Sequence, residues 1–474
     1  MKRFKRLGAL CVALAVVLTA LPFAAPGCAA SPVLNDPASI RTGLKLGRRD
    51  RLLIVAPHPD DEALSSAGLI QKALDLKIPV KVVLMTNGDG YKKAAVVDLK
   101  DPDPTAGDFQ KLGGERHNET IAAMSRLGLA RKDIYFLCYP DGGLEAMFTR
   151  NWDYGCAREG RNGCDTAPYT FSYEKQAQYC GQNVVKNLQS ILSDFKPTTI
   201  VFPGAEDIHH DHWAANAFIE YTITMMRYRC RAFTYLVHRG KTWPQPTYFS
   251  PRDYLLPPLA LTDSDAHWFK IPLTAAEESN KMKAVACYKS QLKLTAGYLE
   301  SFIRRNELVA VYPDILIEPL KKEPDFFTHP ALHGRVMIDP PLDTFLNDLA
   351  PFGDIRSVGF AYNTRKLWFT VDTQAGIHKG VTYAFHMRIF KKDKIERLDL
   401  RVLDGVPSFQ KYANNSLNPK YSTRVRLNET RLVVELPDDY LKDTEYVMTN
   451  VDTYVAGESE SKWVDRTGWR RIVL

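Results

Sequence analysis

Short aliphatic runs alternate with longer amphipathic stretches over the first two-thirds of this 474-residue chain. The apolar runs are residues 52–55, 80–85, 134–137 and 198–202, and the stretches with helical periodicity are residues 62–76, 115–127 and 176–195. Runs that are almost wholly apolar are typical of parallel strands buried on both faces of a sheet. The order of strands and helices predicts an α/β fold, namely a Rossmann-like, mostly parallel sheet with helices on both faces.

The period of the hydrophobic pattern changes after a proline-rich stretch between residues 313 and 341. Apolar side chains then alternate with polar ones, or form short apolar runs, at residues 367–371, 383–389, 398–402 and 432–436. Alternation of this kind is typical of half-buried antiparallel strands. We therefore expect an α/β domain over residues 45–325 and a smaller all-β sandwich over residues 340–474.

Residues 1–30 have the order of a secretory signal peptide. Four basic side chains precede an apolar run, and small residues follow it. The run is short for a transmembrane helix and Pro22 interrupts it, so we expect an extracytoplasmic protein, periplasmic or secreted, without a membrane span. Cleavage among the small residues would release the chain, whereas a lipid anchor at Cys28 is the alternative.

The charge of the chain argues against a nucleic-acid partner. Residues 1–30 hold four Lys or Arg and no Asp or Glu, so without them the formal net charge falls from +7 to +3. The remaining basic residues are dispersed along the sequence. A nucleic-acid-binding face requires clustered positive charge.

Beyond the signal segment the chain has six cysteines: Cys138, Cys156, Cys164, Cys180, Cys230 and Cys287. In an oxidising compartment some of them should form disulfides. Cys156 and Cys164 flank a polar, glycine-containing loop and are the preferred pair. A cysteine zinc site is disfavoured because the chain contains no C-x-x-C pair.

The first predicted strand leads into a cluster of ionisable side chains: His58, Asp60, Asp61 and Glu62. Carboxylates this close repel one another, and a divalent cation would relieve the repulsion. The carboxyl end of a central strand is also where ligands bind in open α/β sheets. Helix capping is the alternative for Asp60 or Asp61, but it accounts for neither His58 nor the second aspartate.

Three of the eleven histidines follow the fourth predicted strand within four positions, at His209, His210 and His212. A histidine-rich loop at a strand end is more often a metal or proton-transfer site than a packing feature. We expect His210 and the neighbouring Asp207 to be merely solvated. Two histidines and one carboxylate leave open positions on zinc, as in catalytic sites, although such sites accept other divalent ions.

The two motifs, residues 56–62 and 209–212, resemble the signatures of the LmbE/PIG-L family of zinc-dependent de-N-acetylases. Further matches are residues 86–90 (TNGDG), Arg116 with Glu119, and residues 288–291 (YKSQ). The resemblance extends over about residues 50–310 and leaves the β-rich tail outside.

The resemblance implies that one zinc ion per chain is bound by three residues: His58, Asp61 and His212. Asp60 would be the general base that activates water. His209, oriented by Asp211, would stabilise the oxyanion or protonate the leaving amine. These roles are the ones that amide hydrolysis requires.

Substrate contacts are implied at Arg116, Asn87 and Asp89, because members of the family bind sugars beside the position of Arg116. An ion pair with Glu119 on the same helix face is the alternative for Arg116. Residues 145–173, rich in Trp, Tyr and Gly, are an insertion relative to the usual short form of the family. Loops at this face of the sheet shape the pocket.

We therefore expect an exported zinc deacetylase that removes N-acetyl groups from an amino sugar in a glycan or glycoconjugate. Two alternatives stay open: a zinc amidase or esterase with a non-sugar acyl substrate, and a non-catalytic surface glycan-binding protein. Trp368, Trp463 and Trp469 would suit carbohydrate binding by the tail. Aromatic residues in alternating strands are usually core, so we expect a structural or accessory role for the tail.

Overall fold

The computed structural model describes residues 36–240, 242–261, 264–327, 336–338, 350–409, 423–457 and 463–474. The predicted signal peptide and its Cys28 lie outside these residues, as do parts of the predicted junction between the domains. Among the described residues, no helix combines the length and the apolar character needed to cross a membrane.

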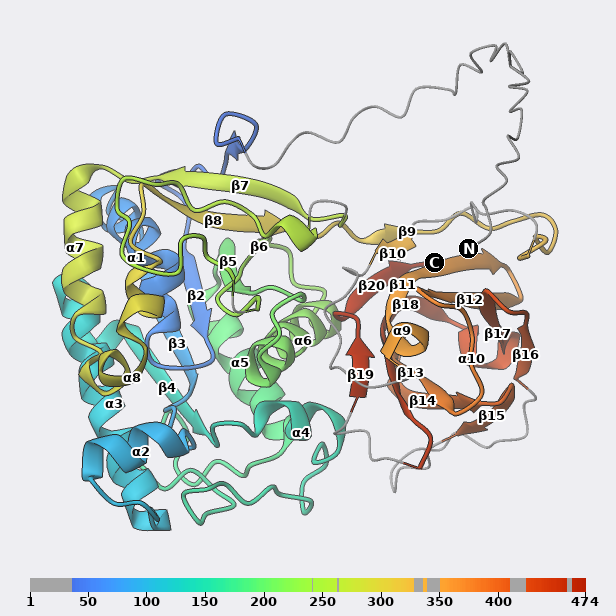
Figure 1. Cartoon of the computed structure of the whole chain (residues 1–474), viewed down its shortest axis with the longest axis horizontal. Coiled ribbons are helices and arrows are strands. Elements are labelled where there is room, and N and C mark those ends of the chain that lie inside the picture. Colours follow the sequence, from blue (N-terminus) through green and yellow to red (C-terminus); the bar gives the residue numbers. More distant parts are fainter. Residues whose placement is uncertain are drawn as a thin grey trace, which may run out of the picture. The chain divides into compact units, whose positions relative to one another are not determined.

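The N-terminal part of the described chain is built on one eight-stranded sheet (Figure 1). Its strands, in the order of the sheet, are β1 (Arg41–Thr42), β7 (His267–Pro272), β8 (Asn306–Val311), β6 (Arg231–Tyr235), β5 (Thr199–Pro203), β2 (Leu52–Ala56), β3 (Val80–Thr86) and β4 (Ile134–Tyr139). Neighbouring strands pair in parallel except at β8, which is antiparallel to β7 and β6. The predicted α/β fold with a mostly parallel sheet is confirmed.

Helices cover both faces of this sheet, which explains why its central strands are apolar throughout. All five residues of β2 and of β5 are buried. The helices are α1 (Asp61–Asp75), α2 (Lys92–Leu99), α3 (Ala106–Arg126), α4 (Leu144–Thr149), α5 (Gly181–Phe195), α6 (His210–Met225), α7 (Ala275–Val285) and α8 (Lys289–Glu300). Helices α1, α3, α7 and α8 pack together on one face, and α4, α5 and α6 on the other (Figure 1).

Strands β2 and β5 form the point at which the strand order reverses. From β2 the chain proceeds to β3 and then β4 on one side, whereas β5 and β6 lie on the other side of β2. The two strands pair in parallel, so the loops that follow them begin at the same edge of the sheet. Ligands bind at such switch points in α/β proteins. Both histidine-containing motifs follow these two strands.

The C-terminal part consists of strands in two further sheets. One sheet contains, in order, β10 (Val336–Ile338), β11 (Ile355–Asn363), β12 (Lys366–Thr373), β17 (Arg431–Pro437) and β16 (Arg424–Leu427). The other contains β15 (Val406–Phe409), β14 (Ile395–Leu403), β13 (Val381–Lys391), β18 (Thr444–Val455), β20 (Arg470–Val473) and β9 (Ile315–Leu316), with β19 (Trp463–Arg466) paired to β18. Two short helices, α9 (Ala350–Gly353) and α10 (Asp438–Leu441), accompany them.

Apolar side chains from the two sheets share one core, in which Phe369 of β12 contacts Phe360 of β11 and Phe385 of β13. Most of the strands are antiparallel, as predicted for an all-β region. Strand β9 pairs in parallel with β20, although it precedes the predicted start of the sandwich. The sandwich therefore recruits a strand from the end of the segment that the sequence assigns to the α/β domain.

The six cysteines of the described chain are all free, so the predicted Cys156–Cys164 disulfide is wrong. Each of the two sulfur atoms has its own polar neighbour: Asn151 Nδ2 lies 3.7 Å from Cys156 Sγ, and Asn162 O lies 3.6 Å from Cys164 Sγ. The loop between them is closed by backbone hydrogen bonds, including Gly160 N–H to Cys164 O at 2.8 Å. Backbone pairing thus holds this segment without a covalent link.

Candidate metal centre

Three atoms of the predicted zinc ligands form a triangle at the switch point. His58 Nδ1 lies 3.3 Å from His212 Nε2 and 3.3 Å from Asp61 Oδ2, and the last two atoms are 3.0 Å apart. In a tetrahedral zinc site with bonds of about 2.0–2.1 Å, ligand atoms lie roughly 3.3–3.4 Å from one another. Asp61 Oδ1 is buried and has no hydrogen-bond partner among the described residues. The donor set and its spacing therefore fit a divalent ion.

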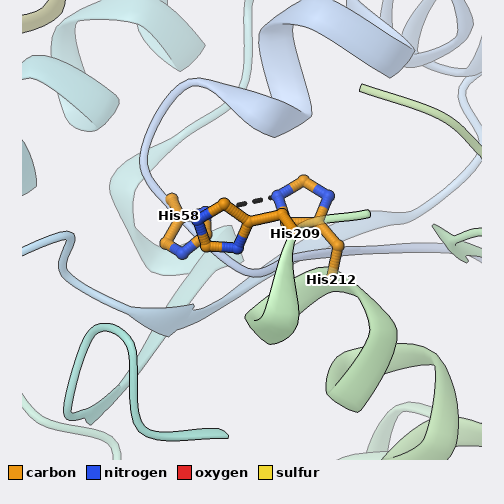
Figure 2. A group of neighbouring side chains, drawn as sticks. All are labelled: His58, His209 and His212. Atoms are coloured by element: carbon orange, nitrogen blue, oxygen red, sulfur yellow. Dashed lines mark hydrogen bonds between the residues drawn. The ribbon is translucent and has the colours of Figure 1, made fainter. Parts of the chain in front are cut away.

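His209 lies beside this triangle. The rings of His58, His209 and His212 offer nitrogen atoms within 4.8 Å of one another (Figure 2). Nδ1 of His209 accepts a hydrogen bond from the backbone N–H of Asp211 (3.2 Å), which leaves Nε2 as its other functional atom. Burial, followed by the charges of nearby histidines, lowers the pKa of His209 well below its usual value. His209 is thus placed to be either a third histidine ligand or the predicted acid.

On each histidine of the triangle, the ring nitrogen that is not part of the triangle contacts a carboxylate. Asp211 Oδ2 lies 3.1 Å and Asp141 Oδ1 lies 3.2 Å from His58 Nε2. Asp207 Oδ2 lies 3.0 Å from His212 Nδ1. A carboxylate on the far nitrogen of a ligating imidazole fixes the tautomer and the orientation of the ring. Both ligand histidines therefore have the support that metal sites require.

The carboxylate of Asp211 does not orient His209, in contrast to the prediction. Besides His58, it accepts hydrogen bonds from the backbone N–H groups of Gly142 (2.7 Å) and Leu144 (3.0 Å). Only the backbone of Asp211 contacts the His209 ring. The reason is that residue 211 lies in the first turn of α6, where its side chain is directed at the loop after β4.

Asp207 is buried, so the expectation that it is merely solvated is wrong. It accepts hydrogen bonds from the backbone N–H groups of His209, Val237 and His238, each at 3.0 Å, in addition to its contact with His212. These bonds join the loops that follow β5 and β6. His210 is exposed, as expected, but it bonds Glu145 through Nδ1.

The side chain of Asp60 does not cap α1, although Asp60 occupies the N-cap position. The capping alternative for Asp60 is therefore wrong. Its φ of 125° is a strained conformation of the kind that clusters at functional sites. Burial raises the pKa of Asp60 to about 8, and the charge of Arg116 opposes this rise. A carboxylate with such a pKa can accept a proton from water near neutral pH.

Arg116 is buried against the loop that carries Asp60. Its guanidinium donates to Pro59 O (2.7 Å), Gly88 O (3.1 Å) and Asp60 Oδ2 (3.4 Å). The alternative of an ion pair with Glu119 is wrong, because Glu119 accepts hydrogen bonds from Ser290 instead. A Cβ atom at Gly88 would lie 1.8 Å from Arg116 Nη1, so the guanidinium needs a glycine there. The structure thus gives Arg116 a positioning role towards Asp60.

The other two predicted substrate residues have partners within the protein. Asn87 Nδ2 lies 3.3 Å from Cys138 Sγ. Asp89 accepts hydrogen bonds from the hydroxyl group of Tyr169 (2.7 Å) and from Asn162 Nδ2 (2.8 Å). Asp89 therefore fastens the inserted segment, residues 145–173, to the end of β3. The assignment of both residues as substrate contacts stays a prediction.

Three residues of the site are absent from the sequence prediction as functional groups: Asp141, Asp207 and His238. Asp141 follows β4 and His238 follows β6, at the edge of the sheet where the two motifs lie. The ring of His238 is 4.6 Å from that of His212 and 4.9 Å from that of His209. All three residues come after a parallel strand, and this position is the sequence signal that could have identified them.

Residues 53–222 match the family model described as GlcNAc-PI de-N-acetylase. This span includes both motifs and is shorter than the region of about residues 50–310 over which the resemblance is expected. A search of the curated proteins found no significant match.

Among solved structures, the zinc-inhibited form of teicoplanin deacetylase is 19% identical, with 56% of this chain and 99% of that chain covered and a TM-score of 0.37. N,N'-diacetylchitobiose deacetylase from Pyrococcus horikoshii is 17% identical, with 56% and 84% covered and a TM-score of 0.34. A 4-carboxy-2-hydroxymuconate hydratase from Pseudomonas putida KT2440 is 13% identical, with 57% and 99% covered and a TM-score of 0.36. Structural similarity at these identities and TM-scores gives no evidence about the reaction of this protein. The match to the family model lies within residues 53–222 and covers the two motifs on which the predicted resemblance rests.

Proposed function

We propose that this protein is a zinc-dependent de-N-acetylase that acts outside the cytoplasm on an N-acetylated amino sugar in a glycan or glycoconjugate. The observation that carries the proposal is the triangle of His58, Asp61 and His212 next to Asp60, within a domain that matches a de-N-acetylase family. The extracytoplasmic location rests on the signal-like residues 1–30 alone.

The three ligand residues would hold the ion, and their nitrogen and oxygen donors suit zinc. A zinc ion held there supplies Lewis-acid polarisation of the acyl oxygen and activation of water. Hydrolysis then forms a C–O bond to water and breaks the C–N bond, so that acetate and a free amine leave. The chain's own side chains must take one proton from water and give one to the departing nitrogen.

Asp60 is the residue proposed to take the proton from water. Its buried carboxylate favours the protonated form, and the neighbouring Arg116 limits that preference. The Nε2 atom of His209 is proposed to serve the departing nitrogen, because Nδ1 is occupied by the backbone N–H of Asp211.

The test combines metal analysis with an assay of acetate release from N-acetylglucosamine oligomers. We expect one zinc per chain in the wild-type protein. Asp60→Asn should retain the zinc and lose about 100- to 10,000-fold in kcat, the range for a general base. His212→Ala should lose the zinc. Normal zinc content without acetate release from any N-acetyl sugar would overturn the substrate class, and absence of bound metal would overturn the mechanism.

A further inference from the structure

Asp60, the proposed base, belongs to a short loop between β2 and α1 that is held at several points. Its φ of 125° is one that residues other than glycine rarely adopt, and such a conformation persists only where the surrounding structure restrains it. Thr86 restrains the start of the loop, because its backbone N–H and its hydroxyl group both donate to Pro57 O at 2.9 Å. Arg116 restrains the loop at Pro59 O. A third contact holds the backbone N–H of Asp60.

Glu62 provides this third contact. Its Oε2 atom accepts a hydrogen bond from the backbone N–H of Asp60 (3.1 Å), and its Oε1 atom accepts one from the hydroxyl group of Tyr288. The side chains of Glu62 and Tyr288 are both fully buried, so each carboxylate oxygen depends on a partner within the protein. A hydrogen-bonded chain thus runs from Tyr288, the residue before α8, through Glu62 to the backbone of Asp60.

Helix capping by itself does not explain this arrangement. The capping boxes of the chain begin α3 and α7, where Thr105 and Thr274 exchange hydrogen bonds with the residue three positions later. Glu62 lies only two positions after Asp60, and the side chain of Asp60 forms no capping bond in return. A cap also needs no partner from another helix, whereas Glu62 has one in Tyr288.

Residues 288–291 make a second connection to Asp60. The backbone N–H and the hydroxyl group of Ser290 donate to the carboxylate of Glu119 on α3, at 2.8 Å and 2.7 Å. Glu119 lies one turn after Arg116, whose Nη2 atom is 3.4 Å from Asp60 Oδ2. The first connection therefore ends at the backbone of Asp60, and the second ends at its carboxylate.

We propose that Glu62 and Tyr288 are positioning residues that hold the backbone of Asp60 in place, with Glu62 as the contact and Tyr288 as its anchor. The inference rests on the proposed function and adds two residues that act through the base. A small displacement of a catalytic group lowers the rate even where the substrate still binds. The metal ligands are linked independently of Glu62, because the backbone N–H of His58 donates to Asp61 Oδ2 (3.0 Å). Loss of the chain should therefore lower kcat and leave zinc bound.

The test uses the full chain and measures kcat and KM for acetate release from N-acetylglucosamine oligomers, the dissociation constant of zinc, and the Tm. Tyr288→Phe removes only the hydroxyl group that anchors Glu62. We expect kcat to fall about 10- to 100-fold, with KM and the zinc dissociation constant within about threefold of the wild type. The matched control is Tyr383→Phe in the all-β part, where the hydroxyl group of another buried tyrosine donates to Phe352 O (3.2 Å). The control should lower the Tm and leave kcat unchanged.

Substitutions of Glu62 test whether the hydrogen bond to Asp60 is what matters. Glu62→Gln keeps an oxygen that can accept the N–H of Asp60, so it should retain most of the wild-type kcat. Glu62→Ala should lose at least as much kcat as Tyr288→Phe. The double variant Glu62→Ala/Tyr288→Phe should have the kcat of Glu62→Ala, because the hydroxyl group of Tyr288 acts only through Glu62.

Wild-type kcat in Tyr288→Phe would overturn the positioning role and leave the deacetylase, as would an equal loss of kcat in Tyr383→Phe. Loss of zinc from Tyr288→Phe, or effects that multiply in the double variant, would also contradict it. If Glu62→Ala does not fold, Tyr288→Phe and its control decide the case. Absence of acetate release by the wild-type protein from every N-acetyl sugar would instead overturn the proposed function, and the positioning role with it.

Discussion

Replacement of Arg116 by methionine would remove the positive charge beside the proposed base. Arg116 Nη2 lies 3.4 Å from Asp60 Oδ2, and both residues are buried. Two unit charges about 4 Å apart interact by about 4 kcal/mol at an effective dielectric constant of about 20. That energy corresponds to about 3 pKa units. Without Arg116, the pKa of Asp60 should rise further above the value of about 8 to which burial brings it.

The sign of the effect on catalysis follows from the role of Asp60. A base must be deprotonated, so activity falls as the pH drops below its pKa. A higher pKa in Arg116→Met should move the acidic limb of the pH profile of kcat/KM to higher pH. We expect a shift of at least about one unit, because water that enters the space of the guanidinium screens part of the effect.

The assay is the pH profile of kcat/KM for the wild-type protein, Arg116→Met and Arg116→Lys, each with its zinc content measured. Arg116→Lys keeps the charge but has one donor nitrogen in place of the two guanidinium nitrogens that bond Gly88 O and Pro59 O, so its acidic limb should stay near that of the wild type. A profile of Arg116→Met that coincides with the wild-type profile would refute the electrostatic argument. A shift of equal size in both variants would show that loop position, and not charge, controls Asp60.

Three further predictions concern stability and metal. Burial lowers the pKa of His117 to about 4, so its contribution to stability is present above pH 6.5 and is lost as the pH falls toward 4. His117→Phe should reduce this loss by about 1–2 kcal/mol in urea unfolding, and an equal loss in both proteins would contradict it. Arg466→Ala should cost about 3–5 kcal/mol, because Glu145 and Asp452 stay buried without their cation; a cost below about 1 kcal/mol would argue against the network. Removal of the metal ion by a chelator should lower the Tm of the protein, and return of the ion should restore it, since a bound ion stabilises only the folded state. An unchanged Tm would count against the metal centre.

Within the α/β part, the strands that could be predicted from sequence are those that are buried on both faces. The runs at residues 52–55 and 80–85 correspond to β2 and β3 within one residue at either end. Strands β6, β7 and β8 are missed because they carry polar residues. In β8, Glu307 is fully buried, accepts hydrogen bonds from the backbone of α1 at Gly68 and Leu69, and pairs with Lys281. Such a residue interrupts an apolar run and is explained only by contacts distant in sequence.

The site residues that could be predicted are close in sequence, whereas those that were missed come together only through contacts distant in sequence. His58 and Asp61 are three residues apart, so a local motif suffices to place them together. Asp141 and His238 lie in other loops, as single polar residues without a motif. Their proximity depends on the order β4-β3-β2-β5-β6, which follows from packing and not from any local pattern. The partner of Asp211 is misassigned for the same reason, since His58 is 153 residues away.

The contacts between the two parts of the chain also predict that the α/β part is not stable in isolation. Removal of residues 312–474 would expose Phe148 and Trp213, whose rings lie 5.2 Å and 6.0 Å from that of Trp469, and would remove Arg466, the cation that pairs with Glu145. Exposed apolar patches of this kind lead to association. We expect residues 36–311 to be aggregated, or to have a much lower Tm than the full chain, in size-exclusion chromatography and thermal unfolding. A monomeric fragment with the Tm and the kcat of the full chain would show that the all-β part is dispensable.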